Sequence, residues 1–339
     1  MNIFKDGILV DINVCFWSGA KILTAQDLGL DEKKIVGAYK LGRKMLIPAD
    51  TIRTFRALES KARHLIEQNS FKFPLGNARF VPKKKFPRIL KSLKEYQQKY
   101  TELTEALIAN YDNLRLEMLP VYTEAATTAF ERHIPIGTHE FSIESLEQKK
   151  ENFIIEFLAR IREFYPEAET LRGRFSLNWD VYEIALPRLK ITNAEKLADK
   201  QIKTEIANEE YKEQTQKKIS AFIDEVVTTL RQEAVTFCDN IVKNIKEGKV
   251  ISGRTLKSLK NFVSNFSEFN FVGDAVVENQ LNALKEEFLD KHTTPAIAKD
   301  MQLQVELQRR LRIVSELASN VTDINSVTGE YHRKINWEK

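Results

Sequence analysis

The longest regular pattern in the chain lies between Pro187 and Gly248, where 60 residues (188–247) pass without a proline or a glycine. These two residue types interrupt regular structure more than any others, so their absence predicts one very long helix. The helix is expected to begin at 192–195, where Thr-Asn-Ala-Glu has the spacing of a capping box, and to end before Gly248. A helix of that length measures roughly 80 Å and must lie against other helices or another chain.

The apolar positions of this predicted helix are concentrated in its second half. They are Ile219, Ile223, Val226, Leu230, Ala234, Phe237, Ile241 and Ile245. Their average spacing of about 3.7 residues is closer to an eleven-residue repeat than to a heptad, which predicts straight or faintly right-handed packing. The preceding segment 208–218 is nearly all polar and is expected to face solvent or a partner.

Shorter helices are expected after the long one, over residues 255–266, 275–289 and 295–318. Asp274 stands at the N-cap position of the second of these helices. Thr294 is expected to cap the third, with Pro295 at its first helical position.

The first 85 residues have a different texture, typical of a small α+β domain. Apolar residues alternate over 8–16, which predicts a half-buried strand. A helix is expected over 50–68, after Pro48, and a short extended pair over 71–81. Apolar residues at a period of two predict a second strand within 175–186, whose only strong partner is the first strand.

The segment between those two strands, residues 86–168, is expected to form a helical arm. Its apolar residues recur at alternating steps of three and four over about four heptads, which predicts a coiled-coil-like seam. They are Phe86, Ile89, Leu93, Tyr96, Tyr100, Leu103, Leu107, Tyr111 and Leu114. Pro120 is expected to interrupt or kink this helix. A turn at 133–140 and a second helix over 142–164 would make the arm antiparallel.

These elements predict an α+β fold that is predominantly α, with long helices, a helical arm and a small N-terminal β-sheet. In chain order, the expected parts are a small α+β domain over 1–85, the arm over 86–168, a strand returning to the sheet over 169–190, the long helix with a three-helix region over 191–320, and a flexible tail over 321–339. Within that tail, three residues could instead dock against the rest of the protein: Tyr331, Ile335 and Trp337.

Composition narrows the class of protein only a little. The 52 basic and 48 acidic residues leave a net charge of +4 at pH 7, too weak to argue for nucleic-acid binding by itself, and dense balanced charge is typical of solvated helix faces. Cys15 and Cys238 lie far apart without metal-ligand spacing, which favours a reducing compartment with neither a disulfide nor a zinc site. No apolar run approaches the roughly 18 residues that span a bilayer, and no signal-peptide pattern is present, so a cytoplasmic protein without membrane contact is expected.

No motif for catalysis, cofactor binding or metal binding stands out. The segment from Gly37 to Gly42 resembles a phosphate-binding loop, but Arg43 stands where that loop requires lysine, so we interpret it as coincidence. His133 and His139 lie in a predicted turn, at a spacing that fits no common zinc pattern. No serine or cysteine has the context of a nucleophile elbow. We therefore expect a protein that is not an enzyme and that has no cofactor.

The most suggestive candidate site is a basic cluster at 79–94. It consists of Arg79, Lys83, Lys84, Lys85, Arg88, Lys91 and Lys94. Interleaved with it are four aromatic residues, Phe71, Phe73, Phe80 and Phe86. Cations and aromatic rings together can follow a nucleic-acid backbone and stack on its bases. The simpler interpretation, which we favour, packs the phenylalanines in the core and places the lysines on the surface at the start of the arm.

Several short motifs follow one another along the chain. They are Phe16-Trp17-Ser18-Gly19-Ala20-Lys21, Asp27-Leu28-Gly29, Pro48, the helix with Phe55, Leu58 and Ala62, Phe80-Val81-Pro82, Arg174-Phe175-Ser176, Thr255-Leu256 and Asn270-Phe271-Val272-Gly273-Asp274. In this order they resemble an uncharacterised bacterial and phage family, a domain of unknown function found on phages and mobile elements, over most of residues 8–290. Members of that family are often encoded beside MoxR-type AAA ATPases and von Willebrand-type proteins. The resemblance implies an accessory or adaptor role and carries over no catalytic residues.

The function expected from these observations is a non-enzymatic helical scaffold or adaptor, accessory to a MoxR-type AAA ATPase as the resemblance implies. The arm and the long helix offer more apolar seam than one chain easily buries. Binding of a protein partner, self-association and purely internal packing all stay open. The alternative function is nucleic-acid binding through the cluster at 79–94.

Overall fold

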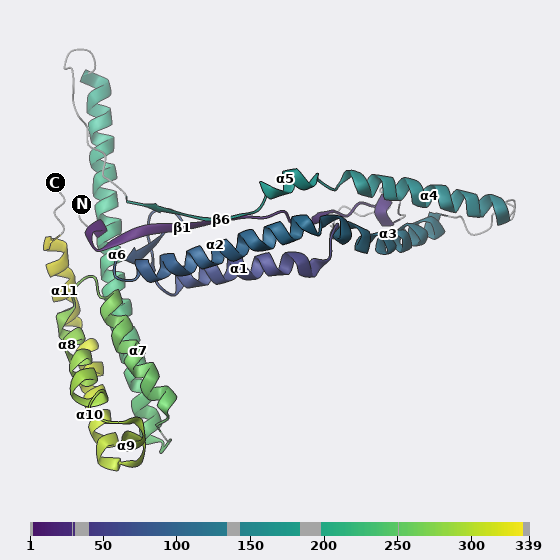
Figure 1. The fold of residues 1–339 in the computed structure, drawn as a ribbon. Helices are drawn as coiled ribbons and strands as arrows, with labels where there is room; N and C mark the ends of the chain where they lie inside the picture. Colours follow the sequence, from purple (N-terminus) through teal and green to yellow (C-terminus); the bar gives the residue numbers. More distant parts are fainter. Residues whose placement is uncertain are drawn as a thin grey trace. The chain divides into compact units, whose positions relative to one another are not determined.

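Figure 1 shows the protein as a computed structural model that describes residues 3–28, 30, 41–133, 143–183, 198–249 and 251–334. Over these residues the chain is predominantly helical with small β-sheets, so the predicted α+β class is confirmed. Contacts divide the chain into two compact units. We call them outer and inner by their places along the sequence. The outer unit is Met1–Asp11, Leu65–Leu90 and Asp180–Lys339, and the inner unit is Ile12–His64 and Lys91–Trp179. None of the described helices is both long enough and apolar enough to cross a membrane.

The larger sheet has four strands in the order β4-β5-β1-β6. They are β1 (Gly7–Cys15), β4 (Phe71–Lys72), β5 (Arg79–Pro82) and β6 (Ser176–Tyr182). β5 pairs antiparallel with both β1 and β4, and Gly7 lies opposite Pro82. The strands predicted at 8–16 and 175–186 are therefore neighbours, and the helical segment between them is an insertion within one sheet, as predicted. The end of the second prediction, 184–186, lies outside the described residues.

Strand β1 departs from the predicted alternation, since Gly7–Val10 are all buried. The run Ile8-Leu9-Val10 is apolar at every position, which is typical of an interior strand covered on both faces. A side chain cannot replace the hydrogen of Gly7, because a Cβ there would lie 2.2 Å from the ring of Phe80.

Helix α6 (Ala198–Lys246) is the longest element of the outer unit and runs unbroken for 49 residues. At 1.5 Å per residue it is about 73 Å long. The predicted continuous helix is confirmed from residue 198 onward, and it does not break near Asn208. The predicted capping box at 192–195 lies outside the described residues.

The apolar stripe of α6 is covered by the chain itself. Ile219, Ile223, Val226, Leu230, Ala234 and Ile241 are buried, and Phe237 and Ile245 are partly buried against the same core. Other parts of that core come from β1, β5, α7 (Gly253–Phe269), α8 (Ala275–Ala283), α10 (Met301–Ala318) and α11 (Val321–Lys334). Of the alternatives left open by the sequence, internal packing is therefore the one found for 219–245. A stripe shows only that apolar surface must be covered, because the hydrophobic effect does not distinguish internal from foreign partners.

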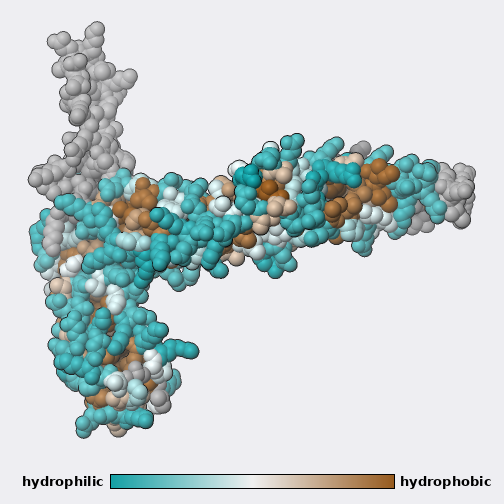
Figure 2. Space-filling model, viewed as in Figure 1, coloured by the Kyte–Doolittle hydropathy of each residue, from teal (hydrophilic) through white to brown (hydrophobic). Residues whose placement is uncertain are grey.

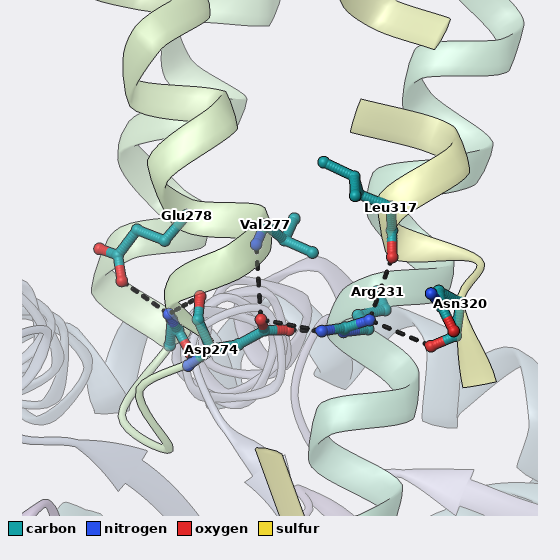
Figure 3. A network of polar contacts seen from close by, with 7 residues as sticks. Arg231, Asp274, Val277, Glu278, Leu317 and Asn320 are labelled. Carbon is teal, nitrogen blue, oxygen red and sulfur yellow. Dashed lines mark hydrogen bonds and ion pairs between the residues drawn. The ribbon is translucent and has the colours of Figure 1, made fainter. Parts of the chain in front are cut away.

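A buried ion pair joins α6, α8 and α10 (Figure 3). Arg231 of α6 is 1% exposed, and its Nε and Nη2 donate to the two carboxylate oxygens of Asp274 at 2.6 and 3.0 Å. Its Nη1 donates to the backbone carbonyls of Leu317 at 3.1 Å and Asn320 at 3.3 Å. Asp274 also accepts from the backbone N–H of Val277, which confirms it as the predicted N-cap of α8. A buried charge is tolerated when it is paired in this way, so the network fixes three helices together.

The turn that leads into α8 supports this network. The side chain of Asn270 accepts from the backbone N–H of Asp274 at 2.8 Å and donates to its carbonyl at 3.1 Å. Asn270 also donates to Glu278, which accepts a second hydrogen bond from Ser267. Gly273 has a φ of +80°, a conformation that residues with side chains rarely adopt. The motif Asn270–Asp274 is thus a structural turn that places the buried carboxylate.

The helix predicted over 295–318 is two helices, α9 (Thr294–Lys299) and α10. The break falls at Asp300, which has an extended conformation and whose side chain accepts from two backbone N–H groups of α10. Aspartate favours such caps over helix interiors, because its carboxylate competes for backbone amides. The N-cap of α9 is Thr293, one residue before the predicted position. α8 is continued by a π-helical segment, Leu284–Leu289.

The expected flexible tail is a helix over its described part, since α11 lies along α6. The polar composition of this segment obscures an amphipathic face formed by Ile324, Val327 and Tyr331, which contact the core. The hydroxyl of Tyr331 donates to Asp6 at 2.8 Å, so the docking predicted for Tyr331 is confirmed. The other two residues expected to dock lie outside the described residues: Ile335 and Trp337.

The inner unit contains most of α1 and α2 and all of the remaining helices of the insertion. The elements are β2 (Ala20–Ile22), β3 (Arg43–Met45), α1 (Ala49–Glu67), α2 (Phe86–Ala109), α3 (Tyr111–His133), α4 (Ile143–Glu163) and α5 (Ala168–Arg172). α1 confirms the helix predicted over 50–68, with Ile52, Phe55 and Ala62 buried. β2 and β3 pair antiparallel as a second sheet, which was not predicted.

The predicted arm breaks at a different residue. α2 ends at Ala109 and α3 begins after Asn110, whereas Pro120 lies inside α3. The Asn110 side chain accepts from Asn113 at 2.8 Å, the kind of local hydrogen bond by which asparagine interrupts a helix. Pro120 is tolerated because it lies on the exposed side of α3, where the carbonyl that loses its amide partner can bind water.

Candidate protein-docking groove

Helices α3 and α4 lie side by side and antiparallel (Figure 1). Phe130 near the end of α3 is 5.6 Å from Phe153 in the first half of α4, measured between ring centroids. Arg115 near the start of α3 lies 5.0 Å from the ring centroid of Tyr165, just after the end of α4. The antiparallel arm predicted from the sequence is therefore confirmed for these two helices.

A groove of about 320 Å³ runs between the two helices. It is lined by Asp112, Arg115, Leu116, Leu119, Tyr122, Leu158, Ile161, Arg162 and Tyr165. On both helices the lining residues follow steps of i, i+3, i+4 and i+7, the positions that share one face of a helix. The groove therefore has two matching walls, each with apolar side chains.

Two tyrosines anchor the groove to the end of β3. The hydroxyl of Tyr122 donates to the carbonyl of Met45 at 2.5 Å, and that of Tyr165 donates to the carbonyl of Leu46 at 2.6 Å. Burial raises the pKa of both phenols, so both stay protonated and keep donating at neutral pH. Because these bonds fix the rings, the groove has its shape before anything binds.

Three charged side chains line the groove with these apolar residues. Arg115 Nη1 lies 3.2 Å from the carboxylate of Asp112, and its guanidinium lies over the rings of Tyr165 and Tyr111, at 5.0 and 5.7 Å. Arg162 is exposed and forms no ion pair with any described residue. Two guanidinium groups thus face one carboxylate, which leaves a local excess of positive charge.

Apolar side chains around this groove are exposed to an unusual degree. Leu116 is 63% exposed and Leu119 is 38% exposed. Ile155, one helical turn before Leu158, is 59% exposed and extends the α4 wall. Figure 2 shows brown, apolar surface among the teal where Figure 1 places α3 and α4. Clustered exposed apolar side chains of this kind mark interaction sites more often than isolated ones do.

Sequence reasoning did not single out the groove. Leu116 and Leu119 stand beside Pro120, where the sequence predicts a break, and a break there hides their common helical face. The matching steps in 112–119 and 158–165 were the signal that could have found it.

The residues of the predicted basic cluster serve different purposes. Arg79 of β5 binds the segment that follows α1, since its Nε donates to the Ser70 hydroxyl at 2.8 Å and its Nη2 to the Ser70 carbonyl at 3.3 Å. Lys84 is exposed and donates to the carbonyl of Ser267 at 3.4 Å. The others that are exposed are Lys83, Arg88, Lys91 and Lys94. Contact of these side chains with nucleic acid or a partner stays a prediction.

Lys85 is not on the surface, contrary to its place in the predicted cluster. It is 2% exposed, and its Nζ lies 3.2 Å from the side-chain oxygen of Asn69 and 3.6 Å from the carboxylate of Glu268. The same ammonium lies 3.6 Å from the ring centroid of Phe269. Burial lowers the pKa of Lys85 to about 8. Lys85 therefore belongs to the interior of the outer unit and not to its basic surface.

The aromatic rings interleaved with the cluster are also internal. Phe73 and Phe80 are 1% and 0% exposed and pack against Phe222 of α6, with ring centroids 5.3 and 5.5 Å apart. Phe71 and Phe86 are half-buried. The simpler interpretation is confirmed for Phe73 and Phe80, which cannot stack on bases.

The remaining candidates from the sequence lie mostly outside the described residues. The glycine-rich loop lies mostly outside the described residues; Lys44 at its end is 2.7 Å from Asp27 and 4.3 Å from the ring centroid of Phe164. The side chains of His133 and His139 also lie outside the described residues. Within the described ranges, no group of three histidine, cysteine or acidic side chains could hold a metal ion.

Comparison with known proteins finds a similarity for the N-terminal part of the chain. No curated protein and no solved structure matches the chain. Residues 4–134, which include β1, α1 and the α3 wall of the groove, match the model of a family described as "Protein of unknown function (DUF3150)". The N-terminal part of the chain is thus similar to a family of unknown function, and a link to phages or to ATPases stays a prediction.

Proposed function

We propose that this protein is a non-enzymatic helical scaffold or adaptor that binds a protein partner in the groove between α3 and α4. The observation that carries the proposal is a pre-shaped groove lined by Leu116 and Leu119, which are exposed although both are apolar. Covering them would remove apolar surface from water, which is the main driving force of protein association. The tyrosine anchors support the same conclusion, because a rigid groove loses little conformational entropy on binding.

The partner that the family resemblance favours is a MoxR-type AAA ATPase. The protein would then be an accessory of that ATPase in a phage or mobile element. This part of the proposal rests on the resemblance, and the docking groove is the surface through which such an accessory would act.

Co-purification tests the proposal. The chain is expressed with the products of its neighbouring genes, and Leu116→Asp and Leu119→Asp are compared with Val305→Asp on α10, an apolar residue of similar exposure (57%) in the outer unit. We expect a neighbouring protein to co-purify with the wild type and the Val305 variant but not with the groove variants. Equal recovery with all variants, or a monomeric chain that retains none of these proteins, would overturn the proposal.

Nucleic-acid binding is the second candidate, supported by the exposure of Lys83, Arg88, Lys91 and Lys94. Phosphate contacts by such residues make binding weaken steeply with salt. Triple replacement of Lys83, Lys91 and Lys94 by alanine should then abolish a mobility shift of single-stranded DNA or RNA. Absence of any shift at low salt would remove this candidate.

A further inference from the structure

We infer that the α3–α4 groove binds an acidic amphipathic helix, one that presents leucine-type side chains every three or four residues with carboxylates beside them. The inference rests on the proposed function and states the chemistry of the partner at the same site.

The shape of the groove fits a helix. Its walls are two antiparallel helices, and each contributes side chains at i, i+3, i+4 and i+7: 112, 115, 116 and 119 on α3, and 158, 161, 162 and 165 on α4 and just beyond. A third helix packs into the space between two such rows by placing its own ridge of side chains in it. An extended strand would need unpaired backbone groups at the walls, and helical walls offer none.

Apolar contacts would come from aliphatic side chains on both walls of the groove. Leu116, Leu119 and Leu158 supply aliphatic surface on both walls, and Ile155 extends it by one turn of α4. A helix with leucine-type residues on one face covers all four residues at once. Covering them explains why apolar residues occupy positions that face water in the unbound chain.

The net positive charge of the groove favours a negatively charged partner. Arg162 has no ion pair among the described residues, and Arg115 has only Asp112, whose own side chain is 89% exposed. Such an exposed pair contributes little and can be exchanged for a better one. The position of Arg115 over two tyrosine rings holds its guanidinium ready for a carboxylate, which arginine binds with two parallel hydrogen bonds.

Two synthetic helical peptides test this chemistry. Both have about 18 residues, or five turns, and the same leucine positions, and one carries glutamate and the other lysine beside the leucines. Fluorescence anisotropy with the full chain should show the acidic peptide binding at least about tenfold more tightly than the basic one, with an advantage that shrinks as salt increases. Arg162→Glu should reduce or reverse the preference, and Leu119→Asp should abolish binding of both peptides. Arg254→Glu on α7, also an exposed arginine without an ion pair among the described residues, should change neither.

The outcomes separate this inference from the proposed function. If both peptides bind equally and Arg162→Glu has no effect, the partner chemistry is wrong, while co-purification that depends on Leu119 would still support a docking groove. If neither peptide binds, the helix-in-groove mode is wrong. If sedimentation shows a dimer that Leu119→Asp dissociates, a second copy of this chain occupies the groove, and an acidic foreign helix is overturned.

Discussion

Replacing Asp274 with alanine should loosen the outer unit at the point where α6, α8 and α10 meet. The change removes the partner of Arg231, which is 1% exposed, and leaves a guanidinium buried with only two backbone carbonyls. Breaking a buried ion pair from one side costs about 3–5 kcal/mol. Losing the N-cap of α8 adds about 1 kcal/mol. A loss of about 4 kcal/mol or more is therefore expected.

Hydrogen exchange measured by mass spectrometry is the suitable assay, because it reports the free energy of opening for each helix separately. Since 1.4 kcal/mol is a factor of ten, the amides of α8 and α10 should exchange roughly a thousandfold faster. Asp274→Asn keeps the shape of the side chain and the N-cap of α8, so its exchange rates should lie between those of the wild type and the alanine variant.

The matched control is Asp290→Ala, which breaks the ion pair with Lys260. That pair has a similar distance, 2.8 Å, but its side chains are 42% and 46% exposed. An exposed pair contributes less than about 1 kcal/mol, so exchange should accelerate less than about fivefold. If Asp274→Ala accelerates exchange no more than Asp290→Ala does, burial does not determine how much the Arg231–Asp274 pair contributes to stability, and the reasoning is refuted.

Three further predictions concern single residues. The folded-state pKa of Lys85 is about 8, below its ordinary value of 10.5, so between these values the unfolded chain holds a proton that the folded chain has released, and stability rises with pH. From pH 8 to 9, the free energy of unfolding measured in urea should therefore increase by roughly 1 kcal/mol more for the wild type than for Lys85→Met. Equal increases for the two proteins would contradict this. Cys15 is exposed, whereas burial raises the pKa of Cys238 to about 12. A thiol reagent at pH 8 should therefore modify Cys15 in the native chain and Cys238 only after denaturation. Rapid modification of both cysteines in the native chain would refute the buried position of Cys238. Gly273→Ala should lower the thermal unfolding midpoint through a loss of about 1–2 kcal/mol of stability, because the φ of residue 273 is +80°. Gly329→Ala, inside α11 with room for a methyl group, should raise the midpoint slightly. The opposite order of midpoints would contradict the turn geometry.

Elements with a strong local signal could be predicted from the sequence. α6 follows from the absence of proline and glycine, β6 from a period of two, and the start of α8 from Asp274. Local rules suffice in these places because the signal and the structure involve the same few residues.

The other features depend on contacts between distant residues. The periodicity of α6 predicts an apolar stripe but not that α10 and α11 cover it. Lys85 is buried because Asn69, Glu268 and Phe269 surround it, and no property of residues 83–85 contains that information. The groove has one wall from 112–122 and one from 158–165, so it becomes visible only once α3 and α4 are paired.

The nesting of the two units sets an order for their formation on the ribosome. All of the inner unit lies between residues 12 and 179, so it can close before the later part of the chain exists. The outer unit cannot do so, because its N-terminal strand packs with α6 and because Asp6 receives its hydrogen bond from Tyr331, 325 residues later. Until α6 and the helices after it have been synthesised, Ile3 and Phe4 belong to an incomplete core, and exposed apolar surface of this kind favours aggregation during synthesis.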